Sequence, residues 1–61
     1  MLKMIEFTKD CGYETRTASV SVMSDFCRVT IEGSRNLYEC ETDTLEDALT
    51  LVKRYGFVEA L

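Results

Sequence analysis

The sequence predicts an α+β fold, in which a three- to four-stranded antiparallel meander sheet packs one face against a single C-terminal helix. Several segments alternate apolar and polar residues, which is typical of half-buried strands. One later segment instead carries an apolar stripe with helical spacing. A chain of 61 residues has room for one core, so we expect one small domain over residues 1–61. Sheet and helix each bury their apolar side only against the other, which predicts a two-layer domain.

The first strand is predicted over residues 2–8. Ile5 and Phe7 lie on one side of this alternating stretch, and polar residues lie mostly on the other. Residues 9–13 then have the composition of a loop, in which Gly12 allows backbone angles that other residues avoid.

Three further strands are predicted over residues 16–23, 26–32 and 35–41. Ser24-Asp25 is a plausible two-residue turn between the first two. Gly33-Ser34 suits a type II′ turn between the last two, because this turn prefers glycine at its first position. The strands therefore form two consecutive hairpins.

These turns also predict which residues face each other. The first hairpin places Val20 opposite Val29. The second predicts three pairs, which are Cys27 with Cys40, Arg28 with Glu39, and Glu32 with Arg35. Opposite charges that face across strands contribute about 0.2–1 kcal/mol each. In this register one side of the sheet is apolar, and it carries Ala18, Val20, Val22, Cys27, Val29, Ile31 and Tyr38.

The helix is predicted to begin after Thr44, whose hydroxyl can cap it, with Asp47 in a capping-box position and Asp43 as a rival cap. Its apolar stripe consists of Leu45, Ala48, Leu49, Val52 and Tyr55. Gly56 suits the position just past the helix end. Residues 57–61 alternate weakly, so we expect a short final strand or a docked tail.

Composition excludes several classes of function. The net charge of −4 and the pI near 4.6 disfavour binding to nucleic acid or to anionic membranes. The chain has no histidine, the residue that acid–base and nucleophilic catalysis use most often, so we expect no enzyme activity and no cofactor. A metal site is also not expected, because there is no C-x-x-C motif and no histidine to complete a zinc site.

The three cysteines, Cys11, Cys27 and Cys40, point to a reducing compartment, because disulfide-built secreted domains usually have an even number. Cys11 is expected to be the exposed one. Cys27 and Cys40 are expected to be small buried hydrophobic residues, with a cross-strand disulfide as the alternative. No apolar run reaches the roughly 20 residues of a membrane span, and no signal-peptide pattern is visible. We therefore expect a cytoplasmic location.

The main candidate for function is an acidic run over residues 39–47. Its carboxylates are Glu39, Glu41, Asp43, Glu46 and Asp47. One interpretation is structural. The helix dipole stabilises carboxylates near a helix N-terminus, and Glu39 is expected to face Arg28. The other is a negative patch that docks on a basic surface, with Glu41, Asp43 and Glu46 as the unpaired charges.

Two apolar residues beside the same turn, Met23 and Phe26, are expected on the outer face of the sheet without a cover. In the predicted register Glu41 lies opposite Phe26. An apolar anchor with an acidic rim is how protein interfaces are built. The predicted partner-binding residues are thus Glu41, Asp43, Glu46, Asp47, Glu39, Phe26 and Met23.

A strand that leads directly into Thr44-Leu45-Glu46-Asp47-Ala48-Leu49, followed by a short helix and Gly56-Phe57, resembles small phage-encoded inhibitors of bacterial machinery. One such group blocks host RNA polymerase, and the anti-CRISPR proteins are another. The resemblance covers about a third of the chain and carries over no specific functional residue. It implies a small, acidic, non-catalytic protein that occludes a nucleic-acid-binding enzyme in a bacterial host cell.

Together these observations favour a protein-binding module, monomeric or homodimeric, that occludes a basic surface of a bacterial protein or nucleoprotein complex. The module itself is expected to bind no nucleic acid directly and no membrane. The alternative is a self-associating scaffold component, in which the edge strand over residues 2–8 and the tail over residues 57–61 pair with a second copy.

Overall fold

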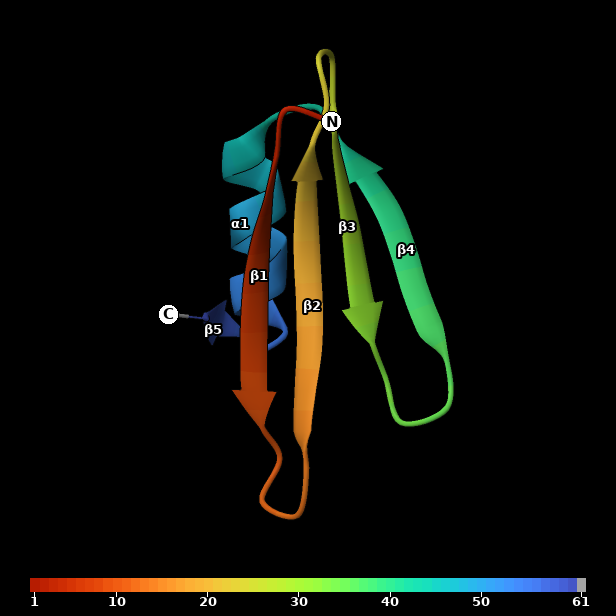
Figure 1. Cartoon of the computed structure of the whole chain (residues 1–61), viewed down its shortest axis with the longest axis vertical. Helices are drawn as coiled ribbons and strands as arrows, with labels where there is room; N and C mark the ends of the chain where they lie inside the picture. The colour runs from red at the N-terminus through yellow and green to blue at the C-terminus, as the bar shows by residue number, and fades with distance from the viewer. Residues whose placement is uncertain (61) are drawn as a thin grey trace.

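The computed structural model describes residues 1–60 and contains a five-stranded antiparallel sheet with one helix against one face (Figure 1). The elements in chain order are β1 (Lys3–Asp10), β2 (Thr15–Val22), β3 (Cys27–Glu32), β4 (Leu37–Thr42), α1 (Leu45–Arg54) and β5 (Val58–Glu59). The strand order across the sheet is β4-β3-β2-β1-β5. The predicted α+β architecture is confirmed, and the sheet has five strands where three or four were expected.

The core lies between the helix and the apolar side of the sheet. Its buried residues are Phe7, Ala18, Val20, Cys27, Val29, Ile31, Ala48, Val52 and Phe57. Alternation along the strands sends these side chains toward the helix, as the sequence pattern predicts. Full burial of one large apolar side chain stabilises the fold by about 1.5–3 kcal/mol. We call this side of the sheet the inner face and the opposite side the outer face.

The first hairpin of the meander has the predicted register. Val20 lies opposite Val29, and the Met23 N–H donates to the Phe26 carbonyl at 2.8 Å. The loop is therefore the two-residue Ser24-Asp25 turn. Met23 and Phe26 are each half-buried, so they are less exposed than the sequence suggested.

The second hairpin corrects the prediction. The Gly33 N–H donates to the Asn36 carbonyl at 2.8 Å, so the two-residue loop is Ser34-Arg35 rather than Gly33-Ser34. This moves the register by two residues, which leaves every side chain on its predicted face but changes its partner. The predicted pairs of Cys27 with Cys40, Arg28 with Glu39, and Glu32 with Arg35 are wrong. The observed pairs are Cys27 with Thr42, Arg28 with Glu41, and Glu32 with Leu37.

Both ends of α1 are capped as the sequence predicts. The Thr44 hydroxyl accepts a hydrogen bond from the Asp47 N–H at 3.1 Å. At the other end Gly56 adopts a positive φ of 91°, and its N–H donates to the Lys53 carbonyl at 2.9 Å. The Phe57 N–H donates to the Val52 carbonyl at 3.1 Å, which completes a Schellman motif. The chain thus reverses and places Phe57 in the core.

Residues 2–8 were predicted to form an edge strand, and this is wrong in part, because β5 pairs with the end of β1. Thr8 lies opposite Val58, Phe7 lies opposite Glu59, and the Ala60 N–H donates to the Glu6 carbonyl at 2.9 Å. A short final strand is therefore confirmed at Val58–Glu59, while Leu61 lies outside the described residues. The long open edge of the sheet is β4, at the right in Figure 1.

The helix is shorter than the sheet that it covers. Its 10 residues span about 15 Å, whereas the 8 residues of β1 or β2 span about 26 Å. In Figure 1 the β1–β2 and β3–β4 loops extend below the end of α1. The inner face is therefore not covered by the helix at that end of the sheet.

Candidate functional site

The edge strand β4 presents free backbone groups along its open side. Hydrogen-bonded and non-hydrogen-bonded pairs alternate along an antiparallel ladder. Because the Gly33 N–H bonds to Asn36, the next residue, Leu37, faces outward, and Glu39 and Glu41 follow at alternate positions. Their N–H and C=O groups have no neighbouring strand in the described part of the chain. Such an edge can pair with an additional strand.

The same strand carries the first two acids of the predicted patch. Glu39 and Glu41 lie on the outer face, opposite Thr30 and Arg28 respectively. Glu41 is not an unpaired charge, because its Oε2 accepts from Arg28 Nη2 at 3.2 Å. Glu39 is the acid of β4 without an ion pair, since it lies opposite Thr30 and not opposite Arg28 as the sequence predicted. The two acids exchange the roles that were predicted for them.

The remaining three acids lie where the chain crosses from the sheet to the helix. Asp43 lies between β4 and α1, and Glu46 and Asp47 lie in the first turn of α1. All five carboxylate residues are exposed. We call the set of Glu39, Glu41, Asp43, Glu46 and Asp47 the acidic corner. It extends over both layers, from the outer face of β4 around the end of the sheet to the helix.

Part of the acidic corner is architectural. Glu46 and Asp47 lie at the helix N-terminus, where negative charge is favoured by the helix dipole. Asp47 also donates its N–H to the Thr44 cap. Asp43 and Glu39 have no ion-pair partner among residues 1–60. These two residues are the acids of the corner that no local interaction accounts for.

Met23 and Phe26, the apolar residues predicted as an anchor, do not lie directly opposite the acids of β4. Met23 and Phe26 close the β2–β3 turn, and the corrected register places Arg28 rather than Phe26 opposite Glu41. The most exposed large hydrophobic residue on β4 itself is Leu37, which is 61% exposed, whereas Tyr38 on the inner face is 45% exposed. Leu37 is therefore better placed than Met23 or Phe26 to contact a partner at the β4 edge.

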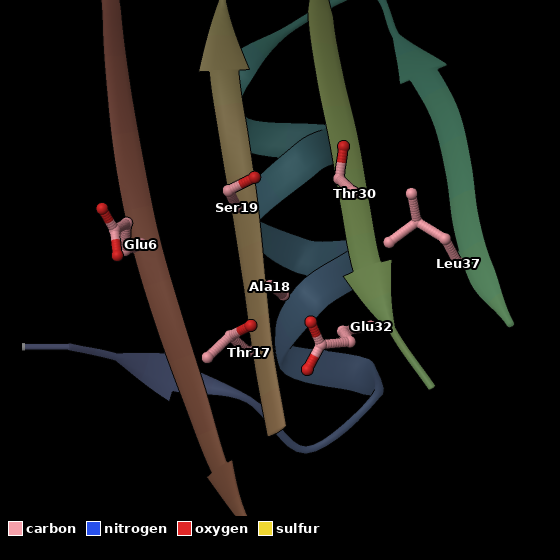
Figure 2. A pocket seen from close by; sticks show the side chains of 7 residues that line it. All are labelled: Glu6, Thr17, Ala18, Ser19, Thr30, Glu32 and Leu37. Atoms are coloured by element: carbon pink, nitrogen blue, oxygen red, sulfur yellow. The ribbon is translucent and has the colours of Figure 1, made fainter. Parts of the chain in front are cut away.

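The outer face holds a shallow depression of about 120 Å³, shown in Figure 2. Its floor is formed by hydroxyl-bearing side chains, which are Thr17, Ser19 and Thr30. The carboxylates of Glu6 and Glu32 border the depression, and Leu37 lies on its β4 side. This volume is well below the roughly 300 Å³ of a small-molecule site. The polar, open floor suits contact with a partner surface rather than enclosure of a ligand.

Two residues outside the acidic corner have shifted pKa values. The pKa of Arg16 is raised, chiefly by the hydrogen bond that its Nη2 donates to Glu14 Oε1 at 3.3 Å. The pKa of Tyr38 is raised, first by its hydrogen bond with the Cys40 thiol, then by the charge of Cys40 and that of Tyr55. Both residues lie at the end of the inner face that α1 leaves uncovered.

The cysteines do not form the pair that the sequence allowed. Cys27 is buried opposite Thr42, Cys40 is half-buried opposite Val29, and all three cysteines are free. Cys11 is half-buried as well, so it is not the exposed cysteine that the sequence predicted. Across residues 1–60 no three His, Cys, Asp or Glu side chains gather closely enough to hold a metal ion.

Two features of these surfaces were missed by sequence reasoning. The Arg28–Glu41 ion pair depends on a register that the turn residues alone did not determine. Lys9 was assigned to a loop, although it lies within β1 and directly opposite Arg16. Extending the alternation of β1 by two residues would have placed Lys9 on the inner face.

None of the described helices has the length and apolarity needed to cross a membrane. No family model, no curated protein and no solved structure matches this chain.

Proposed function

We propose that this chain is a non-catalytic protein-binding module that docks its β4 edge and acidic corner on a basic segment of a larger protein. The observation that carries this proposal is the coincidence of two features on one strand. The backbone groups of Glu39 and Glu41 face the open edge, and their side chains lie on the outer face. Backbone pairing supplies affinity, and the carboxylates select for positive charge.

The alternation along β4 defines the partner further. Glu39 and Glu41 lie on the outer face, whereas Tyr38 and Cys40 lie on the inner face. A strand added at this edge meets carboxylates on one side and apolar or aromatic side chains on the other. The matching segment alternates Lys or Arg with apolar residues.

The biological role that we propose is occlusion. A segment that presents Lys or Arg at alternate positions is typical of surfaces that neutralise phosphates. Covering such a segment blocks nucleic-acid binding without any catalysis, as an inhibitor of the phage-encoded or anti-CRISPR type would do. The acids of the corner then occupy the position that phosphates otherwise hold.

The acids on β4 disfavour self-pairing through the same edge. In a two-fold antiparallel pair centred on Cys40, Glu39 of one copy faces Glu41 of the other. Like charges that face each other across strands are destabilising. This is also a common way in which proteins protect an open edge against unwanted association. A basic partner is therefore favoured over a second copy.

The test uses a capped eight-residue peptide that alternates arginine and valine, with binding measured by fluorescence anisotropy at low and high salt. The double variant Glu39→Lys/Asp43→Lys is expected to weaken binding about tenfold or more. The matched control is Glu6→Lys/Glu59→Lys, which changes the net charge equally on the far side of the sheet and is expected to have a smaller effect. Equal losses of peptide affinity in both variants would mean that the peptide binds only through nonspecific attraction to the net negative charge, which would contradict the proposal.

A second pair of variants separates backbone pairing from charge. Glu39→Ala removes only the carboxylate, whereas Glu39→Pro also removes an N–H that faces the open edge and makes no bond to β3. Glu39→Pro should bind the peptide more weakly than Glu39→Ala. Identical affinities would exclude strand addition. Sedimentation of the wild-type chain completes the test, because a dimer that Glu39→Pro dissociates would favour self-association instead.

A further inference from the structure

The uncovered end of the inner face contains a hollow of about 260 Å³. Cationic and aromatic side chains from four parts of the chain line it, and we call it the cation–aromatic pocket. Those that matter for the argument are Lys9 of β1, Arg16 of β2, Tyr38 of β4, and Tyr55 and Phe57 after α1. It lies where α1 ends before the strands do, so its existence follows from the length difference between helix and sheet.

The two cations of this pocket are placed against each other. Lys9 lies directly opposite Arg16 in the β1–β2 pair, and both belong to the inner face. Like charges in this arrangement are destabilising, and folding could avoid the cost with a neutral residue at either position. Glu14 forms an ion pair with Arg16, whereas Lys9 has no ion-pair partner within residues 1–60. Two facing cations with one paired carboxylate leave a net positive charge beside the hollow, which favours an anion there.

Both cations retain unused hydrogen-bond donors. Lys9 Nζ donates to the Tyr55 carbonyl at 3.0 Å, which uses one of its three N–H groups. Arg16 uses Nη2 for Glu14, but its Nε is shielded from solvent and has no partner. Within residues 1–60 it is the one buried side-chain nitrogen or oxygen without a hydrogen bond. Such a group normally has an acceptor, because leaving it unpaired is costly.

The aromatic side of the pocket can hold a flat group. The rings of Tyr38 and Tyr55 stack with centroids 6.0 Å apart and planes inclined by 22°. These tyrosines are 45% and 43% exposed, so their rings are not fully covered by the protein. The ring of Phe57 is buried in the core and borders the pocket, with Lys9 Nζ 6.0 Å from its centroid. A further ring can pack against these surfaces with the usual aromatic geometry.

We propose that the cation–aromatic pocket binds a small organic anion in which one aromatic ring carries a single carboxylate or phosphate. The anionic group lies between Lys9 and Arg16 and accepts from N–H groups of the ammonium and the guanidinium that Tyr55 and Glu14 do not use, and the ring packs on Tyr38 and Tyr55. The volume suits one ring and its acidic group rather than a larger ligand. This proposal is independent of docking at the β4 edge.

The test is a titration of the full chain followed by amide chemical shifts in ¹H–¹⁵N NMR spectra. The probes are phenyl phosphate, benzoate and inorganic phosphate. Phenyl phosphate or benzoate should move the amide signals of Lys9, Arg16, Tyr38 and Tyr55, and should bind about tenfold more tightly than inorganic phosphate. The stronger of the two identifies the acidic group. Shifts spread evenly over the surface would overturn the proposal.

Variants then assign the roles within the pocket. Arg16→Gln should weaken the preferred aromatic anion about tenfold, because it removes a charged hydrogen bond. The matched control, Lys3→Gln, removes a cation from the same inner face at the other end of β1 and should change affinity less than about twofold. Tyr38→Leu should weaken the aromatic anion but leave inorganic phosphate unchanged. Equal effects of Arg16→Gln and Lys3→Gln would refute a built site.

One more variant keeps the test decisive if Arg16→Gln does not fold. Arg16→Lys retains the positive charge but lacks the planar guanidinium with its several N–H groups, so it should bind more weakly than wild type and more tightly than Arg16→Gln. Affinity unchanged in Arg16→Lys would exclude the guanidinium N–H groups as donors. Dispersed amide signals without ligand confirm that each variant is folded before it is titrated.

Discussion

Arg28 of β3 lies directly opposite Glu41 of the edge strand, and Arg28 Nη2 donates to Glu41 Oε2 at 3.2 Å on the outer face. The two side chains are 46% and 55% exposed, so water and salt screen their attraction. The pair joins the edge strand to its neighbour. It also neutralises one acid of the acidic corner, so Glu39 and Asp43 are the acids that would contribute most to docking on a basic partner.

The first prediction concerns this ion pair. A double-mutant cycle with Arg28→Ala and Glu41→Ala should give a coupling free energy of about 0.2–1 kcal/mol, measured by urea unfolding, because the pair is exposed. The same cycle with Arg28→Ala and Glu39→Ala should give a coupling near zero. A larger coupling for Glu39 than for Glu41 would contradict the observed register.

The two-residue register error has a specific cause. Gly33-Ser34 was chosen as the loop because a type II′ turn prefers glycine first, yet Gly33 has no positive φ. It precedes the loop instead, where an added Cβ would lie 3.0 Å from the Asn36 carbonyl oxygen. Glycine is needed for close approach of two strands rather than for its backbone angles. Sequence alone does not distinguish these two reasons.

Other parts of the fold followed from local pattern. The faces of the strands were predictable because a shift by two residues preserves them, and the helix was predictable from Thr44, the apolar stripe and Gly56. The pairing of β5 with β1 was not, since it joins segments about 50 residues apart in the chain. The cation–aromatic pocket likewise depends on which strands are neighbours. The features that were predicted depend on local sequence pattern, whereas those that were missed depend on contacts between segments far apart in the chain.

The second prediction concerns the start of α1. Thr44→Ala should lower the free energy of unfolding by about 1 kcal/mol, because the Asp47 N–H loses its acceptor. The matched control is Thr50→Ala, which removes a hydroxyl from an exposed position within the helix. It should be neutral or slightly stabilising, since alanine favours helix. Thermal or urea unfolding of both variants measures the difference, and equal stabilities would exclude Thr44 as the cap.

The third prediction compares two glycines with nearly the same backbone angle. Gly12 and Gly56 have φ values of 90° and 91°. Alanine at either position should cost about 1–2 kcal/mol, because side chains disfavour this region. An added Cβ at Gly12 has no atom within 4 Å, whereas at Gly56 it would lie 3.2 Å from Lys9 Cε.

Gly56→Ala should therefore cost more than Gly12→Ala in the same unfolding experiment. The excess arises because Lys9 must move, which disturbs the hydrogen bond from its Nζ to the Tyr55 carbonyl. In the background of Lys9→Ala the two glycine substitutions should become equally costly. An excess that persists without Lys9 would locate the cause in the helix end itself.

The fourth prediction concerns alkaline pH. The folded state raises the pKa of Tyr38, mainly through its hydrogen bond with the Cys40 thiol, above the ordinary value of about 10. The folded protein thus holds the phenol proton more tightly than the unfolded chain does. This contribution to stability is complete below about pH 10 and is lost as the pH rises through the folded-state pKa of Tyr38.

Urea unfolding at a series of pH values should therefore show stability falling above about pH 10, with a smaller fall in Tyr38→Phe, which has no phenol to ionise. Tyr13→Phe, at a loop position that is 83% exposed, is the matched control and should retain the wild-type fall. Cys40→Ala removes the largest cause of the shift, so absorbance titration of the phenolates should show the pKa of Tyr38 moving down toward its ordinary value. An unchanged titration curve in Cys40→Ala would show that the thiol does not hold the Tyr38 proton.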